Sequence, residues 1–332
     1  MSPLAFGRET FEAELLDPRH GFERRTTTVE ARRDPLTGHS ARILPAGSFP
    51  PPARHDLERL AAETRDACPF CAKRIEGQTP RLPAAVWPEG RIRAGEAVLF
   101  PNLVPYAKWS SVSVYSPERH LLPLPELTPV LVADNLRVQR DFGRAVLAFD
   151  PSARWISVNA NHLAPSGSSI FHPHLQGSAN PLPTTMQRLL AAIPPADVRA
   201  YVTDERKDGT RLVAASDGID WIASFAPLGP AEICAFVGAA SSPSELDDSR
   251  VDEVARGISA ALRVYDDLGF ESFNLAFYGV PGAETLLLRL VARAYFGTAE
   301  RSDATWSERL QWEAATDLAP EHVAELARPA FA

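Results

Sequence analysis

The alternation of apolar and polar residues in the first half of the chain predicts strands on either side of one long helix. Residues 97–100 and 111–115 form short apolar runs that are typical of strands, separated by a proline-containing stretch. Residues 126–149 repeat apolar positions every three or four residues after a Thr-Pro pair, which is a typical helix start. Residues 155–158 predict a further strand, which leads into a polar loop.

The same order of elements recurs in the second half. Residues 221–225 and 232–237 predict two strands around a proline-containing turn. Residues 245–268 predict an amphipathic helix, and residues 273–277 and 286–296 predict two closing strands. Many α+β domains share this order by chance, but here the helix and turn positions also correspond. The pattern favours an α+β fold of two duplicated units, each an antiparallel sheet with a packed helix.

Composition divides the chain into an extension and two halves. Residues 1–30 are charged and weakly patterned, and residues 45–54 contain four prolines in a loop-like stretch. We expect residues 1–30 to be an N-terminal extension, residues 31–200 to form the first unit and residues 201–332 to form the second.

Composition and charge exclude several classes of protein. Of the 332 residues 45% are hydrophobic, which suffices for a core without disulfide bonds. A net charge of −8 argues against a nucleic-acid partner, because backbone phosphates are bound by basic patches. No apolar run approaches the roughly 20 residues that span a bilayer, and residues 1–25 lack the apolar centre of a signal peptide. We therefore expect a cytoplasmic protein with no membrane partner.

The segment His172-Pro173-His174-Leu175-Gln176 is the candidate centre of the chemistry. In extended backbone, residues two apart point to the same face, so both imidazoles and the Gln176 amide should project from one side. An imidazole can attack phosphorus as a covalent nucleophile, and a neighbouring amide can stabilise a developing oxyanion. The pattern indicates phosphoryl or nucleotidyl transfer with His174 as nucleophile. The alternative is that His174 is a metal ligand or a buried structural histidine.

Cys68-Pro69-Phe70-Cys71 supplies two thiols from a tight turn, which is half of a tetrahedral zinc site. His120 and His172 could provide the other two ligands. A Cys2His2 set leaves no open position, so we expect a structural zinc ion that joins this turn to the strand carrying His174. The alternative is a redox pair or two unpaired thiols. Cys234 lies in an apolar run and is predicted to be an inert core thiol.

Two further segments are candidates for phosphate contacts. The loop before the two histidines is rich in small residues and hydroxyls, so backbone amides near Gly167 and the side chains of Ser168 or Ser169 could surround phosphate oxygens. Arg32 and Arg33 precede a turn and could make bidentate phosphate contacts. Such a loop can also be an ordinary turn, and such an arginine pair can be a solvated surface.

Together these segments resemble the galactose-1-phosphate uridylyltransferase family of the histidine-triad superfamily over residues 32–328. The matching motifs are Arg32-Arg33-Asp34-Pro35-Leu36-Thr37-Gly38, Cys68-Pro69-Phe70-Cys71, Ser116-Pro117-Glu118-Arg119-His120 and the stretch from Asn161 to Gln176. The resemblance implies histidine-triad-like units, a homodimer, and a His174 that becomes uridylylated or adenylylated.

The resemblance also implies roles for other residues. Gln176, Asn161 and Ser169 match positions near the phosphates, and Asn102, two residues after Phe100, falls where the family contacts the nucleoside. The residues that match the structural zinc ligands are Cys68, Cys71, His120 and His172.

Three departures from the family are visible. Val291-Ala292-Arg293-Ala294-Tyr295-Phe296 stands where the family often has a second His-x-His, so we expect no second metal. Leu103 replaces the acidic residue that usually follows the nucleoside-binding asparagine, which leaves the nucleobase open. The resemblance does not extend to the residues that recognise the hexose, whose places are taken by Asp303, Ala304, Glu308, Arg309 and Ala315.

These features predict an enzyme, a nucleotidyltransferase similar to UDP-glucose–hexose-1-phosphate uridylyltransferases. It would transfer UMP or AMP from a nucleoside diphosphate sugar or dinucleotide donor to a phosphate-bearing acceptor through a covalent nucleotidyl-histidine on His174. The alternative is a phosphorylase that splits ADP-glucose or a dinucleoside polyphosphate with inorganic phosphate, and a hydrolase is a third possibility. A non-catalytic nucleotide-binding protein would not need His174 and Gln176, so their presence argues against that class.

Overall fold

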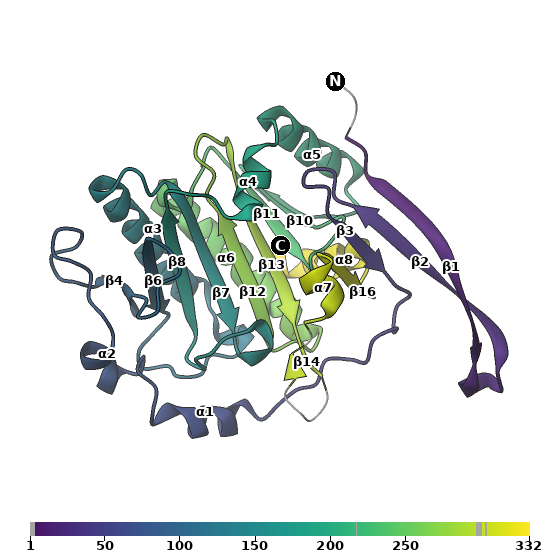
Figure 1. Cartoon of the computed structure of the whole chain (residues 1–332), viewed down its shortest axis with the longest axis horizontal. Coiled ribbons are helices and arrows are strands. Elements are labelled where there is room, and N and C mark those ends of the chain that lie inside the picture. The colour runs from purple at the N-terminus through teal and green to yellow at the C-terminus, as the bar shows by residue number, and fades with distance from the viewer. Residues whose placement is uncertain (1–3, 217, 297–300, 303) are drawn as a thin grey trace.

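A ten-stranded antiparallel sheet forms the centre of the protein (Figure 1). The computed structural model describes residues 4–216, 218–296, 301–302 and 304–332. The strand order is β4-β5-β6-β8-β7-β12-β13-β11-β10-β9. The first half of the chain contributes β4 (Ile92–Ala94), β5 (Ala97–Pro101), β6 (Trp109–Val114), β7 (Trp155–His162) and β8 (His174–Asn180). The second half contributes β9 (Leu212–Ser216), β10 (Ile219–Ala223), β11 (Ile233–Gly238), β12 (Ser272–Tyr278) and β13 (Thr285–Arg293).

Both halves use the same strand order, which confirms the duplication predicted from the sequence. Counted along the chain, the strands of each half lie in the order first, second, third, fifth, fourth from the edge of the sheet inwards. In each half a long helix, α3 (Pro129–Phe149) or α6 (Asp248–Asp267), connects the third strand to the fourth. The units meet where β7 pairs with β12, so their two sheets are one continuous sheet.

α3 and α6 pack side by side against one face of this sheet, behind it in Figure 1. Each helix begins at a residue whose side chain accepts a hydrogen bond from a backbone N–H of the first turn, Thr128 for α3 and Asp247 for α6. Their apolar sides place residues such as Leu136 and Ile258 in one core that both units share.

The face of the sheet opposite these helices, here called the open face, is covered only at its two ends. Residues 68–75, which include the start of α2 (Ala72–Gln78), cover β5 and β6. α5 (Pro195–Asp208) covers β10 and β11, with Tyr201 packed against Phe236. Between these covers, β8, β7 and β12 carry mainly polar side chains on the open face.

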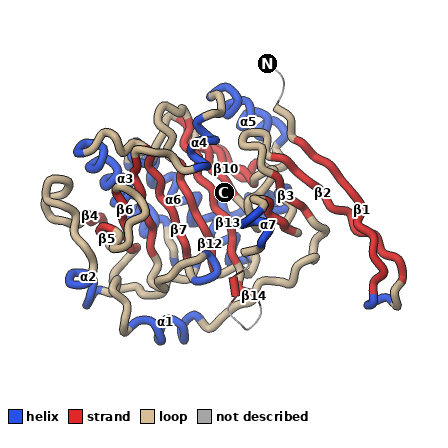
Figure 2. The backbone as a smooth tube through the Cα atoms, in the orientation of Figure 1, coloured by secondary structure: helices blue, strands red, loops and turns tan. Residues whose placement is uncertain are grey.

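Residues 7–33 form a long hairpin, where the sequence predicts only a charged extension. β1 (Gly7–Asp17) and β2 (Glu23–Arg33) pair over their whole lengths and extend away from the central sheet (Figure 2). β3 (Ser40–Ile43) and β16 (Glu313–Thr316) complete a four-stranded sheet, in which β16 runs parallel to β3. The C-terminal part of the chain therefore pairs with the N-terminal part.

The other elements of the described residues are α1 (Leu57–Arg65), α4 (Thr185–Ala191), α7 (Trp306–Leu310), α8 (Pro320–Phe331), β14 (Tyr295–Phe296), β15 (Arg301–Ser302) and the 3₁₀ helices η1 (Pro18–His20), η2 (Leu124–Glu126), η3 (Ala164–Ser166) and η4 (Pro243–Glu245). The predicted boundary at residue 200 falls inside α5, and the division into units at that residue stays a prediction. In the described ranges no helix combines the length and apolar character needed to cross a membrane.

The close approach of α6 to the sheet gives a first prediction. At Gly257 an added Cβ atom would lie 2.1 Å from the buried indole ring of Trp221. We expect Gly257→Ala to lower the free energy of unfolding by about 1–3 kcal/mol, because the ring or the helix must move. Gly77→Ala in α2 is the control, because no atom lies within 4 Å of its added Cβ. Urea unfolding should show Gly77→Ala as neutral or stabilising; equal effects of both changes would contradict the packing argument.

Candidate active site

The segment His172–Gln176 enters β8 at His174 and continues along the open face. β8 pairs with β6 on one side and with β7 on the other, and this register determines the direction of each side chain. Leu175 lies in the core beneath the helices. His174 and Gln176 therefore lie on the opposite side of the strand, next to each other on the open face.

A hydrogen bond within this segment sets the tautomer of His174. Nδ1 of His174 lies 2.8 Å from the backbone carbonyl oxygen of His172. A carbonyl can only accept, so Nδ1 carries the proton and Nε2 keeps its lone pair. His174 is 6% exposed, and burial lowers its pKa while the carbonyl acts in the opposite direction. The ring is therefore neutral at pH 7, with a nucleophilic nitrogen.

The neighbours of these two side chains come from other segments. Phe70, between the two cysteines of the Cys-x-x-Cys turn, packs edge-on against His174 with 5.4 Å between ring centroids. Tyr106, in the loop between β5 and β6, donates its hydroxyl hydrogen to Oε1 of the half-buried Gln176 over 2.9 Å. The sequence does not predict the contact between Tyr106 and Gln176, because residues 101–109 show only a proline-containing connection between two strands.

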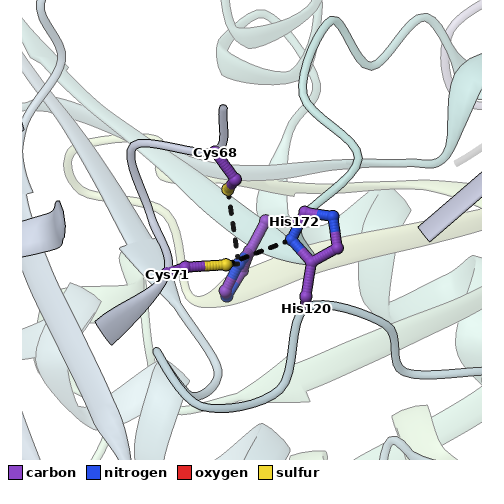
Figure 3. Close-up of side chains that lie close together, drawn as sticks. All are labelled: Cys68, Cys71, His120 and His172. Atoms are coloured by element: carbon purple, nitrogen blue, oxygen red, sulfur yellow. Dashed lines mark hydrogen bonds between the residues drawn. The ribbon is translucent and has the colours of Figure 1, made fainter. Parts of the chain in front are cut away.

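Cys68, Cys71, His120 and His172 point towards one another from separate segments of the chain (Figure 3). Their ligand atoms all lie within 4.8 Å of one another. Sγ of Cys71 lies 3.3 Å from Nδ1 of His120, and Sγ of each cysteine lies 3.7 Å from Nδ1 of His172. A tetrahedral zinc ion gives S···N separations of about 3.6 Å between such ligands. The four residues predicted as ligands therefore have the spacing of a single metal site.

The outer nitrogen of each of the two histidines also has a partner. Nε2 of His172 donates to the carbonyl oxygen of Ser116 over 2.9 Å, and Nε2 of His120 lies 2.9 Å from the hydroxyl of Thr64. When Nε2 carries the proton, Nδ1 is unprotonated and its lone pair faces the thiols, as metal ligation requires. Burial lowers the pKa of His172 to about 3 and raises that of Cys71 to about 11. The donor set fits a closed zinc site, because a dication would supply the charge that the thiolates need.

Amide side chains continue the site across the open face. Asn159 and Asn161 on β7 and Asn274 on β12 line a cavity of about 300 Å³. Nδ2 of Asn274 donates to Oδ1 of Asn161 over 2.7 Å and to the carbonyl oxygen of Ser166 over 3.0 Å. The second unit thus holds the loop that precedes the histidines. The sequence does not mark Asn274 as a site residue, because it is a single polar residue in an apolar strand.

Two arginines of β13 form the far side of this cavity. Arg289 is 5% exposed and pairs with the buried Glu232 over 2.7 Å, and Arg293 pairs with Glu308 on α7 over 2.8 Å. The sequence predicts a closing strand over residues 286–296 and gives these two arginines no role. The signal that could have identified them is their spacing, because Arg289 and Arg293 are four residues apart and therefore share one face of the strand.

The loop between β7 and the histidines turns at Leu163 and Gly167, whose φ angles are 64° and 91°. Glycine adopts such angles at little cost. Ser168 donates its hydroxyl hydrogen to the carbonyl oxygen of Ile170 over 2.7 Å, and Ser169 is exposed. The contacts of Gly167, Ser168 and Ser169 with phosphate stay predictions.

The two residues predicted to contact the nucleoside have structural partners. Phe100 is buried against Phe70, with 5.2 Å between the ring centroids. Oδ1 of Asn102 accepts the N–H of Val104 over 3.1 Å and so shapes the loop that carries Tyr106. Phe100 pairs in register with Val112, which pairs with Gln176, so Phe100 lies on the open face. The contacts of Phe100 and Asn102 with a nucleoside stay predictions.

Arg32 and Arg33 lie on the hairpin and are not brought to His174 within this chain. The guanidinium of Arg32 is buried, makes two 2.9 Å contacts with the carboxylate of Glu321 and lies over the ring of Phe225, whereas Arg33 is exposed. Phe225 follows β10, which lies five strands from β8, or about 24 Å at the usual strand spacing. Within one chain, the buried pairing of Arg32 is structural.

Some of the residues at which this chain departs from the family lie at the cavity. Val291 and Glu308 line it, Arg309 also lies on α7 and Ala315 lies on β16. Asp303 lies outside the described residues. The expectation of no second metal stays a prediction.

Comparisons with known proteins support the fold. No family model matches the chain. An uncharacterised protein of Archaeoglobus fulgidus is 29% identical over 339 aligned positions, covering 97% of each chain. An ADP-glucose phosphorylase from Arabidopsis thaliana, solved with ADP-glucose, is 20% identical with a TM-score of 0.68 and covers 90% of this chain and 98% of its own. A uridylyltransferase structure is 18% identical with a TM-score of 0.58 and covers 91% and 98%. The chain therefore has the fold that the resemblance implied.

The metal group gives a prediction about composition. We expect the purified protein to contain about one zinc ion per chain, and Cys68→Ser to lose it, because three ligands hold zinc less tightly than four. Cys234→Ala is the control, because Cys234 is buried on β11 in a separate cluster. Metal analysis by mass spectrometry measures both proteins. Full zinc content in Cys68→Ser would exclude this ligand set.

The ion pair of Arg32 predicts a dependence of stability on pH. Burial alone would raise the pKa of Glu321, but its hydrogen bond to Arg32 and the charge of Arg32 lower it from 4.5 to about 2. The stabilisation is therefore complete above about pH 4.5 and is lost as the pH falls towards 2. We expect Glu321→Gln to lower the free energy of unfolding at pH 7 and to match the wild type near pH 2. Glu325→Gln, at an exposed position of α8, should have little effect at either pH. A constant difference between Glu321→Gln and wild type would contradict the pairing.

Proposed function

We propose that the protein is a nucleotidyltransferase that carries UMP or AMP on His174 between a nucleoside diphosphate sugar and a phosphate-bearing acceptor. The observation that carries this proposal is the hydrogen bond from Nδ1 of His174 to the carbonyl of His172. It leaves the lone pair of Nε2 free, on a neutral ring of β8, the strand next to the one that brings Asn159 and Asn161 to the cavity. A neutral imidazole with one free nitrogen can act as a covalent nucleophile towards phosphorus.

The reaction then has two displacements. Nε2 of His174 forms a bond to the α-phosphorus, and the bond from that phosphorus to the bridging oxygen breaks, its electron pair leaving with the sugar phosphate. The carbonyl of His172 stabilises the positive charge that the ring acquires. An oxygen of the acceptor phosphate then attacks the same phosphorus, and the electron pair of the N–P bond returns to Nε2.

The surrounding residues supply binding and orientation in this proposal. Gln176 donates from its amide to a non-bridging oxygen of the transferred group, and Asn161 and the loop from Gly167 to Ser169 surround the phosphates. Phe100 and Asn102 lie on the nucleoside side. The role of Arg32 and Arg33 at a distal phosphate stays a prediction from their guanidinium groups, and the homodimer stays a prediction from the resemblance.

A structural zinc ion would support this geometry through His172. Its Nδ1 faces the two thiols, its Nε2 donates to Ser116, and its carbonyl holds His174. The residue that would bind zinc is therefore the residue that orients the nucleophile. Zinc itself takes no part in the transfer, because the Cys2His2 set has no open position.

A second candidate differs only in the acceptor. The ADP-glucose phosphorylase has a higher TM-score with this chain than the uridylyltransferase, 0.68 against 0.58. With orthophosphate as acceptor, the same nucleotidyl-histidine would make this protein a phosphorylase. The two candidates share the first displacement and separate in the second.

The test is the mass of the intact protein after incubation with UDP-glucose or ADP-glucose. We expect a mass increase of one nucleoside monophosphate on wild type and none on His174→Ala. Adding orthophosphate or glucose 1-phosphate should remove the adduct and identify the acceptor. His322→Ala, a change at an exposed histidine of α8, is the control and should retain the adduct. Failure of wild type to form an adduct with either donor, or an adduct on His174→Ala, would overturn the assignment.

A further inference from the structure

The contact between Tyr106 and Gln176 has a direction that matters for the side-chain amide. A tyrosine hydroxyl can donate or accept, but the carboxamide of glutamine has one accepting end and one donating end. Here the hydroxyl of Tyr106 lies 2.9 Å from Oε1 of Gln176 and donates to it. Nε2, the donating end of the carboxamide, therefore points away from Tyr106.

We propose that Tyr106 is a positioning residue that holds the Gln176 carboxamide in the orientation in which its N–H groups face the transferred phosphoryl group. This inference rests on the proposed function and extends it to a residue outside the segment of the two histidines. Without the hydroxyl, the two flipped orientations of the carboxamide differ less in free energy. The donating end would then face the phosphoryl oxygens for only part of the time.

The backbone of the loop places Tyr106 over β8. At its start, the N–H of Asn102 donates to the carbonyl oxygen of Ser110 over 2.9 Å, and Pro105 restricts the backbone directly before the tyrosine. At its end, the N–H of Lys108 donates to Oδ1 of Asn180 over 2.8 Å. Asn180 lies on β8, the strand that carries Gln176, so the loop and the strand are joined at two points.

The contact of Tyr106 is made by its hydroxyl more than by its ring. The residue is 61% exposed, so replacing it by phenylalanine removes a hydrogen bond and little packing. The ordinary pKa of a tyrosine hydroxyl is about 10, so the group is protonated and can donate at neutral pH, and desolvation raises the pKa of Tyr106 further. A charged or missing donor at this place would leave Oε1 of Gln176 without this partner.

The test compares rates of adduct formation at saturating donor in Tyr106→Phe, Gln176→Ala and the double variant, using the donor that labels wild type. We expect Tyr106→Phe to slow the step about three- to tenfold, the value of one hydrogen bond, with the donor concentration at half-maximal rate unchanged within about twofold. In the Gln176→Ala background, Tyr106→Phe should have no further effect, because its action passes through Gln176.

Several outcomes would overturn the inference while leaving the proposed function standing. A rate for Tyr106→Phe within twofold of wild type would do so, as would an equal loss in the presence and absence of Gln176. Val104→Ala is the loop control: its exposed side chain lies two residues from Tyr106, and the variant should react like wild type. An equal slowing by Val104→Ala would show a general effect on the loop and contradict the specific contact.

A second measurement tests the contact without any reaction. The side-chain amide signals of Gln176 can be identified in NMR spectra as those lost in Gln176→Ala. We expect Tyr106→Phe to shift these signals and Val104→Ala to leave them in place. Unchanged signals in Tyr106→Phe would contradict the inference even if no donor labels the protein, whereas failure of labelling alone contradicts only the proposed function.

Discussion

The hydrogen bond between Nδ1 of His174 and the carbonyl of His172 is the interaction on which the candidate site depends. It fixes one proton on the ring, and so it decides which nitrogen can react. A second backbone carbonyl, that of Ser116, holds the proton on Nε2 of His172, so that its Nδ1 faces the two cysteines. Pro173 restricts the backbone between the two histidines. His172 thus links the candidate metal site, which it faces through its side chain, to the orientation of His174, which its carbonyl holds.

The continuous sheet gives the two units different tasks. Along one row of the sheet, Gln176 on β8, Asn159 on β7, Ala276 on β12 and Arg289 on β13 are neighbours in register. The strand order makes Arg289 the counterpart of Gln176 in the second unit, and Leu287 stands two residues before it, where the first unit has His174. The second unit therefore has no histidine at the position that corresponds to His174. It contributes the floor and far wall of the cavity instead.

The sequence predicted the elements that have strong periodicity and missed those that depend on distant partners. The long helices and the buried strands are predicted from apolar spacing, whereas β4 has only three residues and β9 has only one buried residue. The hairpin was missed although Phe11, Ala13 and Leu15 alternate with polar residues at strand spacing, because this short row lies in a segment that is otherwise charged and almost wholly exposed. The burial of Arg32 requires Glu321, 289 residues away, and the place of Tyr106 requires the register of β6 with β8. Motifs locate reactive residues, but the partners that orient them come from tertiary pairing.

The parallel pairing of β3 with β16 also orders events during synthesis. Residues 40–43 can find residues 313–316 only after most of the chain has left the ribosome, whereas the strands and helix of the first unit are complete by Asn180. Non-local pairings of this kind form late, because the chain loses the entropy of closing a long loop before the new contacts can stabilise it. Until then, the sheet of β1, β2 and β3 lacks its fourth strand, and the nascent chain carries an exposed strand edge at β3. The unit that carries His174 can thus become ordered on a chain whose N-terminal sheet still lacks its last strand.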